Sequence, residues 1–139
     1  MSDRPDPGDD LPVWRLADVE PDRMKILALL LADPNPLHYD RAAVVRLGVG
    51  DREVNQGPST MAMAMNALLQ GVPGTRLLRF SARLLGNVLA GDAVEVVGRS
   101  TGGSADDSAD GAGAVTCTFT VRVPGRGDVL TGEAVLVPA

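Results

Sequence analysis

The feature that most constrains the fold is a predicted helix with apolar residues on almost every side. The rest of the chain after this helix shows only the patterns of β-strands. Residues 58–70 read PSTMAMAMNALLQ, and after the first turn only Asn66 and Gln70 are polar. A Gly-Pro pair before this segment and a glycine after it suit the two ends of a helix. A helix that is apolar nearly all round is predicted to be buried.

The second half of the chain alternates apolar and polar residues as antiparallel strands do. The clearest case is residues 114–123, AVTCTFTVRV, where apolar residues alternate with threonine and arginine. This period of two predicts strands with one buried face. Similar patterns cover residues 77–85, 93–101 and 129–137, and the Gly-rich residues 102–113 suit a hairpin loop. The sequence therefore predicts an α+β fold in which an antiparallel sheet wraps around a long buried central helix.

A chain of 139 residues is expected to form one domain. Residues 1–10 are acidic and rich in Pro and Gly, which predicts a disordered tail ahead of a single domain at residues 11–139. No signal-peptide pattern or apolar run of spanning length is seen, so we expect a cytoplasmic protein without membrane contact. The net charge of −5 argues against a nucleic-acid surface. The single cysteine, Cys117, excludes an internal disulfide and is assigned to the core.

The connector ADPNPLHYD, residues 32–40, holds the groups best suited to moving protons. His38 is the only histidine and follows Asp33 by five residues. Prolines on both sides of Asn35 stiffen the connector and end a helix that is predicted to begin at Pro21. Such a connector can aim both side chains at one water molecule. Taken alone, the pattern is more typical of a turn with a solvated or capping histidine, so an acid–base role needs support from elsewhere in the chain.

Three segments supply that support. DPNPLH at residues 33–38, NQGPSTMAMAMNALL at residues 55–69 and RFSARLLGNVLAGD at residues 79–92 occur in this order. Together they resemble the MaoC-like dehydratases, or (R)-specific enoyl-CoA hydratases, of the hotdog-fold superfamily, over roughly residues 19–137. The resemblance implies a hotdog fold and the reversible hydration of trans-2-enoyl-CoA to (R)-3-hydroxyacyl-CoA.

The resemblance also implies roles for individual residues. Asp33 and His38 would handle the water and the proton, and the division between them is open. The backbone N–H of Gly57 would bind the thioester carbonyl as part of an oxyanion hole. Thr60 would orient Asp33, and Asn35 would either help bind substrate or hydrogen-bond local backbone. No metal or redox cofactor is implied, and coenzyme A enters only as part of the substrate.

Two departures from the family pattern adjoin these residues. Ala32 stands where the family usually has Gly, and Gln56 stands where it usually has His. The second departure is compatible with a subgroup that works with a different partner subunit. A half-site subunit that binds acyl thioesters, or acts only with another hotdog protein, is therefore an alternative. A hotdog thioesterase ranks last, because residues 58–70 contain no Asp or Glu to activate water at the carbonyl.

Partners and substrate are only partly constrained by the sequence. A homodimer or a heteromer with another hotdog subunit would cover the surface that a small sheet leaves open. The acyl group, and the choice between coenzyme A and an acyl carrier protein, remain open. Arg76, Arg79 and Arg83 could bind coenzyme A phosphates, although an exposed strand face is the simpler interpretation. Asp106, Asp107 and Asp110 resemble a metal loop in composition only.

Overall fold

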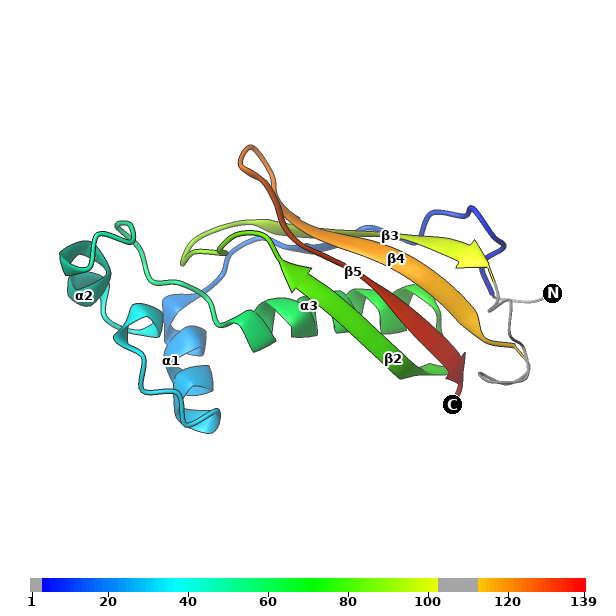
Figure 1. Cartoon of the computed structure of the whole chain (residues 1–139), viewed down its shortest axis with the longest axis horizontal. Helices are drawn as coiled ribbons and strands as arrows, with labels where there is room; N and C mark the ends of the chain where they lie inside the picture. The colour runs from blue at the N-terminus through cyan, green and yellow to red at the C-terminus, as the bar shows by residue number, and fades with distance from the viewer. Residues whose placement is uncertain (1–3, 103–112) are drawn as a thin grey trace.

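The computed structural model describes residues 4–102 and 113–139. One five-stranded antiparallel sheet curves around a central helix (Figure 1). The strand order across the sheet is β1-β3-β4-β5-β2. The expected hairpin loop at residues 102–113 lies almost entirely outside the described residues. The elements are β1 Trp14–Leu16, α1 Pro21–Leu30, the 3-10 helix η1 Pro36–His38, α2 Arg41–Arg46, α3 Gly57–Gly71, β2 Thr75–Leu84, β3 Val94–Gly102, β4 Val115–Val123 and β5 Gly127–Pro138.

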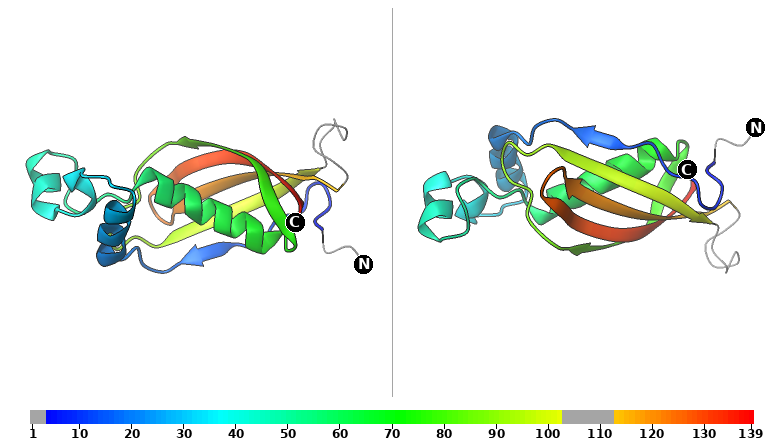
Figure 2. Two further views of the ribbon diagram at one scale, coloured as in Figure 1. Left: turned by 90° about the horizontal axis from the view of Figure 1, so that it is seen from below. Right: turned by 90° about the horizontal axis from the view of Figure 1, so that it is seen from above.

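The core lies between the concave face of the sheet and α3, which runs across the strands in both views of Figure 2. The strict alternation of β4 is confirmed: its valines, Cys117 and Phe119 are buried, and its threonines and Arg122 face outward. Cys117 has no exposed surface, and burial raises the pKa of its thiol to about 11. Met63, Ala64 and Leu68 supply the facing side of α3. The predicted α+β architecture is therefore confirmed.

The central helix is covered on one side only, which corrects the expectation of burial all round. Met63, Ala64, Ala67 and Leu68 are buried. On the opposite side, by contrast, Ala62, Asn66, Leu69 and Gln70 are exposed. A single five-stranded sheet can enclose only part of a helix surface, and the described chain offers no second layer.

A β-bulge changes which residues of β2 face the core. The register with β5 shifts between Leu77 and Arg79, so Leu78 is an extra residue and lies exposed. Leu77, Phe80 and Ala82 point inward, and the Phe80 ring stacks on Phe119 with centroids 5.0 Å apart. The strand was predicted correctly, but the alternation of residues 77–85 does not reveal this shift, because it depends on pairing with β5.

Part of the segment expected to be a disordered tail is instead paired with β3. The Gly8 N–H donates to the Ser100 carbonyl at 2.7 Å, and the Ser100 N–H donates to the Asp9 carbonyl at 2.9 Å. Asp10 forms an isolated bridge with Arg99, and their side chains form an ion pair at 2.9 Å. The backbone here occupies the β3 edge beyond the three residues of β1, a pairing that composition does not reveal.

The helices α1, η1 and α2 form an overhang beyond one end of the sheet (Figure 1). The overhang exposes many large apolar side chains. They are Ile26, Leu29, Leu30, Leu31, Tyr39, Val45, Leu47 and Val49. Exposed apolar surface on this scale marks an interaction site in most proteins. No helix of the described residues is long and apolar enough to cross a membrane.

A buried carboxylate joins the loops at the overhang end of the sheet. The side chain of Asp92 is only 5% exposed and accepts hydrogen bonds from Arg126 at 2.6 Å and Arg52 at 3.1 Å. The Leu89 N–H donates to the same carboxylate at 2.7 Å. Burial acts to raise the pKa of Asp92, but these hydrogen bonds and the two positive charges outweigh it. The pKa therefore lies below its ordinary value of 3.8.

We predict that Asp92→Asn lowers the free energy of unfolding at pH 7 by about 2 kcal/mol, because two arginines lose their shared anion. Because the pKa of Asp92 is lower in the folded state, the carboxylate stabilises the fold fully at pH values above its unfolded-state pKa of about 4. This stabilisation is lost as the pH falls through the folded-state pKa. Urea unfolding should therefore show a wild-type midpoint that falls more steeply below about pH 4 than the variant's. Asp51→Asn is the control, since Asp51 is 77% exposed and 3.9 Å from Arg52. Equal acid sensitivity of wild type and Asp92→Asn would contradict this assignment.

Candidate active site

The connector after α1 begins with a backbone conformation that explains why the family usually has glycine where this chain has Ala32. The Asp33 N–H donates to the Ala28 carbonyl at 2.9 Å, and the Ala32 N–H donates to the Leu29 carbonyl at 3.2 Å. These two bonds form a Schellman ending, which needs a left-handed residue just past the helix. Ala32 occupies that position with φ of 50°, and it is the only non-glycine residue with positive φ in the described chain. Glycine is the residue that this geometry favours.

The next turn is held by side-chain to backbone bonds. The Asn35 N–H donates to Asp33 Oδ1 at 3.1 Å. Asn35 Oδ1 in turn accepts from the Leu37 N–H at 3.1 Å and caps η1. The Tyr39 hydroxyl donates to the Pro34 carbonyl at 2.9 Å. Of the two roles left open for Asn35, the structure shows the local backbone bond.

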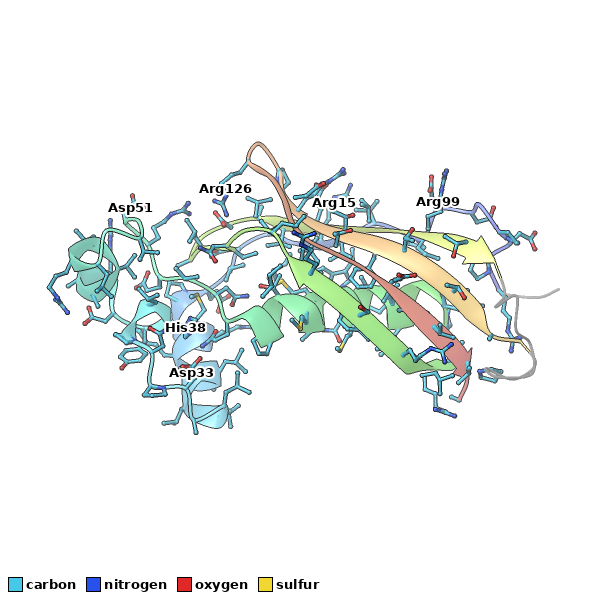
Figure 3. All side chains as sticks on the ribbon, viewed as in Figure 1. Arg15, Asp33, His38, Asp51, Arg99 and Arg126 are labelled. Atoms are coloured by element: carbon cyan, nitrogen blue, oxygen red, sulfur yellow. The ribbon has the colours of Figure 1, made fainter. Side chains whose placement is uncertain are left out.

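Asp33 and His38 lie side by side (Figure 3), with His38 Nε2 3.2 Å from Asp33 Oδ2. The other ring nitrogen, Nδ1, is 2.6 Å from the Val54 carbonyl oxygen. A carbonyl oxygen can only accept, so Nδ1 carries a hydrogen and Nε2 faces the carboxylate. A close contact between Nε2 and Oδ2 is favourable only with a proton between them. The contact is therefore one in which the two side chains share a proton.

The partner of His38 is itself fixed in place. The Val54 N–H donates to the Leu37 carbonyl at 2.8 Å, and Val54 forms a bridge with Leu89. The Asn55 N–H donates to the Val88 carbonyl at 2.8 Å. The histidine side chain is 12% exposed and that of Asp33 is 34% exposed, so the carboxylate is the more open of the two.

His38 shares a cavity with the N-terminus of α3. The cavity has a volume of about 240 Å³, and its lining includes His38, Gly57, Thr60, Asn55 and Leu84. A Cβ atom at Gly57 would lie 3.1 Å from Leu84 Cδ1, so glycine keeps this wall of the cavity clear. Three of the five residues singled out from the sequence thus meet in one cavity.

Asp33 lines a different surface pocket from the one that contains His38. That pocket has a volume of about 670 Å³, and Lys25, Ala32, Pro34 and Tyr39 also line it. The Asp33–His38 contact therefore lies between the two spaces, and its members face opposite sides.

The prediction that Thr60 orients Asp33 is not met within the chain. Thr60 Oγ1 accepts from Asn55 Nδ2 at 3.0 Å and lies 3.4 Å from the Gln56 carbonyl. Asn55 is 6% exposed and lines the cavity, yet it was not singled out from the sequence. The available signal was two consecutive polar residues directly before an apolar helix.

Gln56 connects α1 to the start of α3. Its side chain is 1% exposed, and Nε2 donates to the Met24 carbonyl at 3.0 Å. Its Oε1 atom is buried and has no hydrogen-bond partner among the described residues. The Gln56 side chain thus connects α1, which is part of the overhang, to the N-terminus of α3 beside Gly57.

A third cavity, of about 430 Å³, lies between β1, α1 and α3. Most of its wall is apolar, including Trp14, Leu16, Met24 and Met63. Asn55 lines both this cavity and the one that contains His38. An apolar group bound here would therefore end beside the polar groups of the site. No group of three or more His, Cys, Asp or Glu side chains arranged to hold a metal occurs in the described part of the chain.

Comparison with known proteins agrees with this geometry. A family model described as the MaoC like domain matches residues 5–123, and the chain therefore belongs to that family. A search of curated proteins finds no sequence that matches this chain.

Solved structures are similar over almost the whole chain. The (R)-hydratase from A. caviae involved in PHA biosynthesis has a TM-score of 0.83 and 24% identity, covering 96% of this chain and 97% of its own. A chain of the ChsH1–ChsH2 complex from Mycobacterium tuberculosis has a TM-score of 0.78 and 22% identity, covering 95% and 97%. A chain of the truncated HadBC (3R-hydroxyacyl-ACP dehydratase) complex from the same organism has a TM-score of 0.67 and 18% identity, covering 90% and 94%. The fold is the hotdog fold.

We predict that Ala32→Gly raises the free energy of unfolding by about 0.5–1 kcal/mol. The substitution removes the strain of a left-handed alanine, and this gain is larger than the loss caused by the greater freedom of glycine in the unfolded chain. Chemical denaturation provides the measurement. The matched control is Ala42→Gly in α2, which is exposed and helical and should lose about 0.5–1 kcal/mol. A loss of stability in both variants would show that Ala32 is unstrained.

Proposed function

We propose that the protein catalyses the reversible hydration of a trans-2-enoyl thioester to the (R)-3-hydroxyacyl thioester. The observation that carries the proposal is the Asp33–His38 contact, with the imidazole held by the Val54 carbonyl and set beside the Gly57 terminus of α3. Membership of the MaoC-like family and the similarity to an (R)-hydratase support the same reaction class.

The reaction needs a base for water and an acid for carbon. Water adds its oxygen to C3 of the enoyl group and loses one proton, and C2 gains one proton. The Asp33–His38 pair can accept the first proton and return one to C2, so its protonation is restored after each turnover.

Charge builds up on the thioester oxygen when water attacks C3, because the intermediate is an enolate. The first turn of α3 has backbone N–H groups without partners inside the helix and the positive end of the helix dipole. In our proposal the Gly57 N–H binds this oxygen. The acyl tail extends along the apolar cavity beyond Asn55. Coenzyme A or an acyl carrier protein is present only as part of the substrate, and the proposed steps need no metal or redox cofactor.

We also propose that the working unit contains a second hotdog chain. The exposed side of α3 and the apolar overhang support this assembly, as do the ChsH1–ChsH2 and HadBC complexes among the similar structures.

A half-site subunit is the second candidate function, and Gln56 is the observation that favours it. Its buried, unpartnered Oε1 lies directly before the proposed oxyanion site, where the family usually has His. In this version the chain binds the acyl thioester and hydrates it only when mixed with a partner hotdog protein. A thioesterase ranks lower, because α3 carries no acidic residue in GPSTMAMAMNALLQG.

We predict that the protein consumes crotonyl-CoA or a longer trans-2-enoyl-CoA, measured as loss of enoyl absorbance. Asp33→Asn and His38→Gln should each lower kcat by about 100-fold or more, because each removes one member of the proton-transfer pair.

Tyr39→Phe is the matched control, since it removes one connector hydrogen bond without touching the pair. Its kcat should stay within about threefold of wild type. The proposal is wrong if folded Asp33→Asn and His38→Gln turn over every tested thioester as fast as wild type. Activity that appears only after a second hotdog chain is added would favour the half-site version.

A further inference from the structure

Two cavities follow the same face of the central helix. On α3, the apolar cavity of about 430 Å³ is lined by residues that recur every three or four positions and therefore share one helix face. They are Ser59, Ala62, Met63 and Asn66. Gln70, the next position of this face, lines a further cavity of about 370 Å³. We call it the distal cavity, because it lies farther along α3 from Gly57.

Trp14 of β1 stands between the apolar cavity and the distal cavity. It is the residue that lines both, and it is the only tryptophan of the chain. Of its neighbours along the chain, Leu16 lines only the apolar cavity and Pro12 only the distal one. A Cβ atom at Gly71 would lie 3.3 Å from Leu11 Cβ, which places the start of this segment at the far end of α3. The indole therefore marks the point at which one cavity gives way to the other.

The position of Trp14 is fixed by strand pairing. Its backbone pairs with Val96 of β3, and its side chain is half-buried against the core. The next residue, Arg15, forms an ion pair with Glu95 at 3.2 Å. Because side chains alternate along a strand, Arg15 on the outer face directs Trp14 toward α3. The indole is thus held in place by β3 and by the core.

The polarity of the α3 face changes at the level of Trp14. Ala62 and Met63 border the apolar cavity, whereas the next two positions of the face, Asn66 and Gln70, carry amides. A hydrocarbon tail gains free energy by leaving water only where its new neighbours are apolar. The wall therefore favours a tail that ends near Asn66 and gives a longer tail no further gain.

Helix geometry sets the length of such a tail. Asn66 lies nine residues after Gly57, which is about 13 Å along the helix axis. An extended carbon chain with bonds of about 1.5 Å advances about 1.25 Å per carbon, so about ten carbons cover this distance. Asn55 lines both the apolar cavity and the cavity that contains Gly57, which gives the chain a continuous path. An acyl group of this length, with its carbonyl at Gly57, would end against Trp14.

We propose that Trp14 is a specificity-determining residue that ends the acyl site, and that the substrates are medium-chain thioesters of about eight to ten carbons. The inference rests on the proposed function, because that function places the thioester carbonyl at Gly57. It adds the class of acyl group, which the hydration reaction does not define.

The first test uses the emission of the unmodified protein, because Trp14 is its only tryptophan. The probes are saturated S-acyl pantetheines, which contain the part shared by coenzyme A and acyl carrier proteins and have no double bond to hydrate. Octanoyl- and decanoyl-pantetheine should shift the emission to shorter wavelength, because a tail against the indole excludes water. Butyryl-pantetheine and pantetheine alone should leave the emission unchanged.

The second test measures binding of the same probes by calorimetry in wild type and in Trp14→Ala. In wild type, tetradecanoyl-pantetheine should bind no tighter than decanoyl-pantetheine. Removing the indole frees its volume and joins the two cavities. The affinity for tetradecanoyl-pantetheine relative to octanoyl-pantetheine should therefore rise about tenfold in Trp14→Ala. Trp14→Leu is a second variant that keeps an apolar side chain on β1 for folding, and its relative affinity should rise as well.

Leu77→Ala is the matched control. Leu77 of β2 is partly buried against the core, as Trp14 is, and it lines neither cavity. The relative affinity for the two probes should equal that of wild type in this variant. A change that came only from a loosened core would appear in Leu77→Ala as well.

Two results would overturn the proposal. One is binding of octanoyl- or decanoyl-pantetheine, measured by calorimetry, that leaves the emission of Trp14 unchanged. The other is the same relative affinity for tetradecanoyl- and octanoyl-pantetheine in wild type and in both folded Trp14 variants. Failure of the proposed reaction is a separate result. If the probes bind by length as expected but no enoyl thioester is hydrated, the hydratase proposal is wrong and the acyl site stands.

Discussion

The 2.6 Å hydrogen bond between His38 Nδ1 and the Val54 carbonyl connects the parts on which the site depends. It joins the proline-stiffened connector to the segment that leads into α3, and it determines which ring nitrogen faces Asp33. The reverse strand-like bond, from the Val54 N–H to the Leu37 carbonyl, fixes the same two segments at 2.8 Å. Without these bonds the imidazole could rotate and the connector could move relative to the helix terminus. The protein therefore positions Asp33 and His38 with backbone carbonyls and amides, which cannot change their charge state.

Local patterns predicted most of the fold, and long-range pairings account for what they missed. The alternation in β4 and the helix from Gly57 to Gly71 are read correctly because each depends on neighbours along the chain. The bulge at Leu78 depends on the register with β5, and the pairing of Asp9 with Ser100 depends on an edge left open by the short β1. Composition alone could reveal neither feature.

In the candidate site, too, local contacts were predictable from the sequence and long-range contacts were not. The proximity of Asp33 and His38 follows from a connector whose geometry is set by its prolines, and the sequence was sufficient to predict it. The contacts of Thr60 were not predictable, because Asn55 competes for its hydroxyl from a segment that joins the site through Val88. Ala32 shows the opposite case, because its φ of 50° gives a local reason for the glycine that the family pattern has at this position.

The incomplete enclosure of α3 relates the fold to the proposed chemistry. Proton transfer and enolate stabilisation are strongest where water is excluded, because electrostatic interactions strengthen in a low dielectric. In the single chain, Asp33 remains 34% exposed and the outer side of α3 is open. In the proposed assembly, a second hotdog chain would cover part of this exposed surface. The surface that most needs a partner is thus next to the groups that most need to be shielded from water. In the proposed function, assembly would therefore shield the same end of the helix at which the reaction takes place.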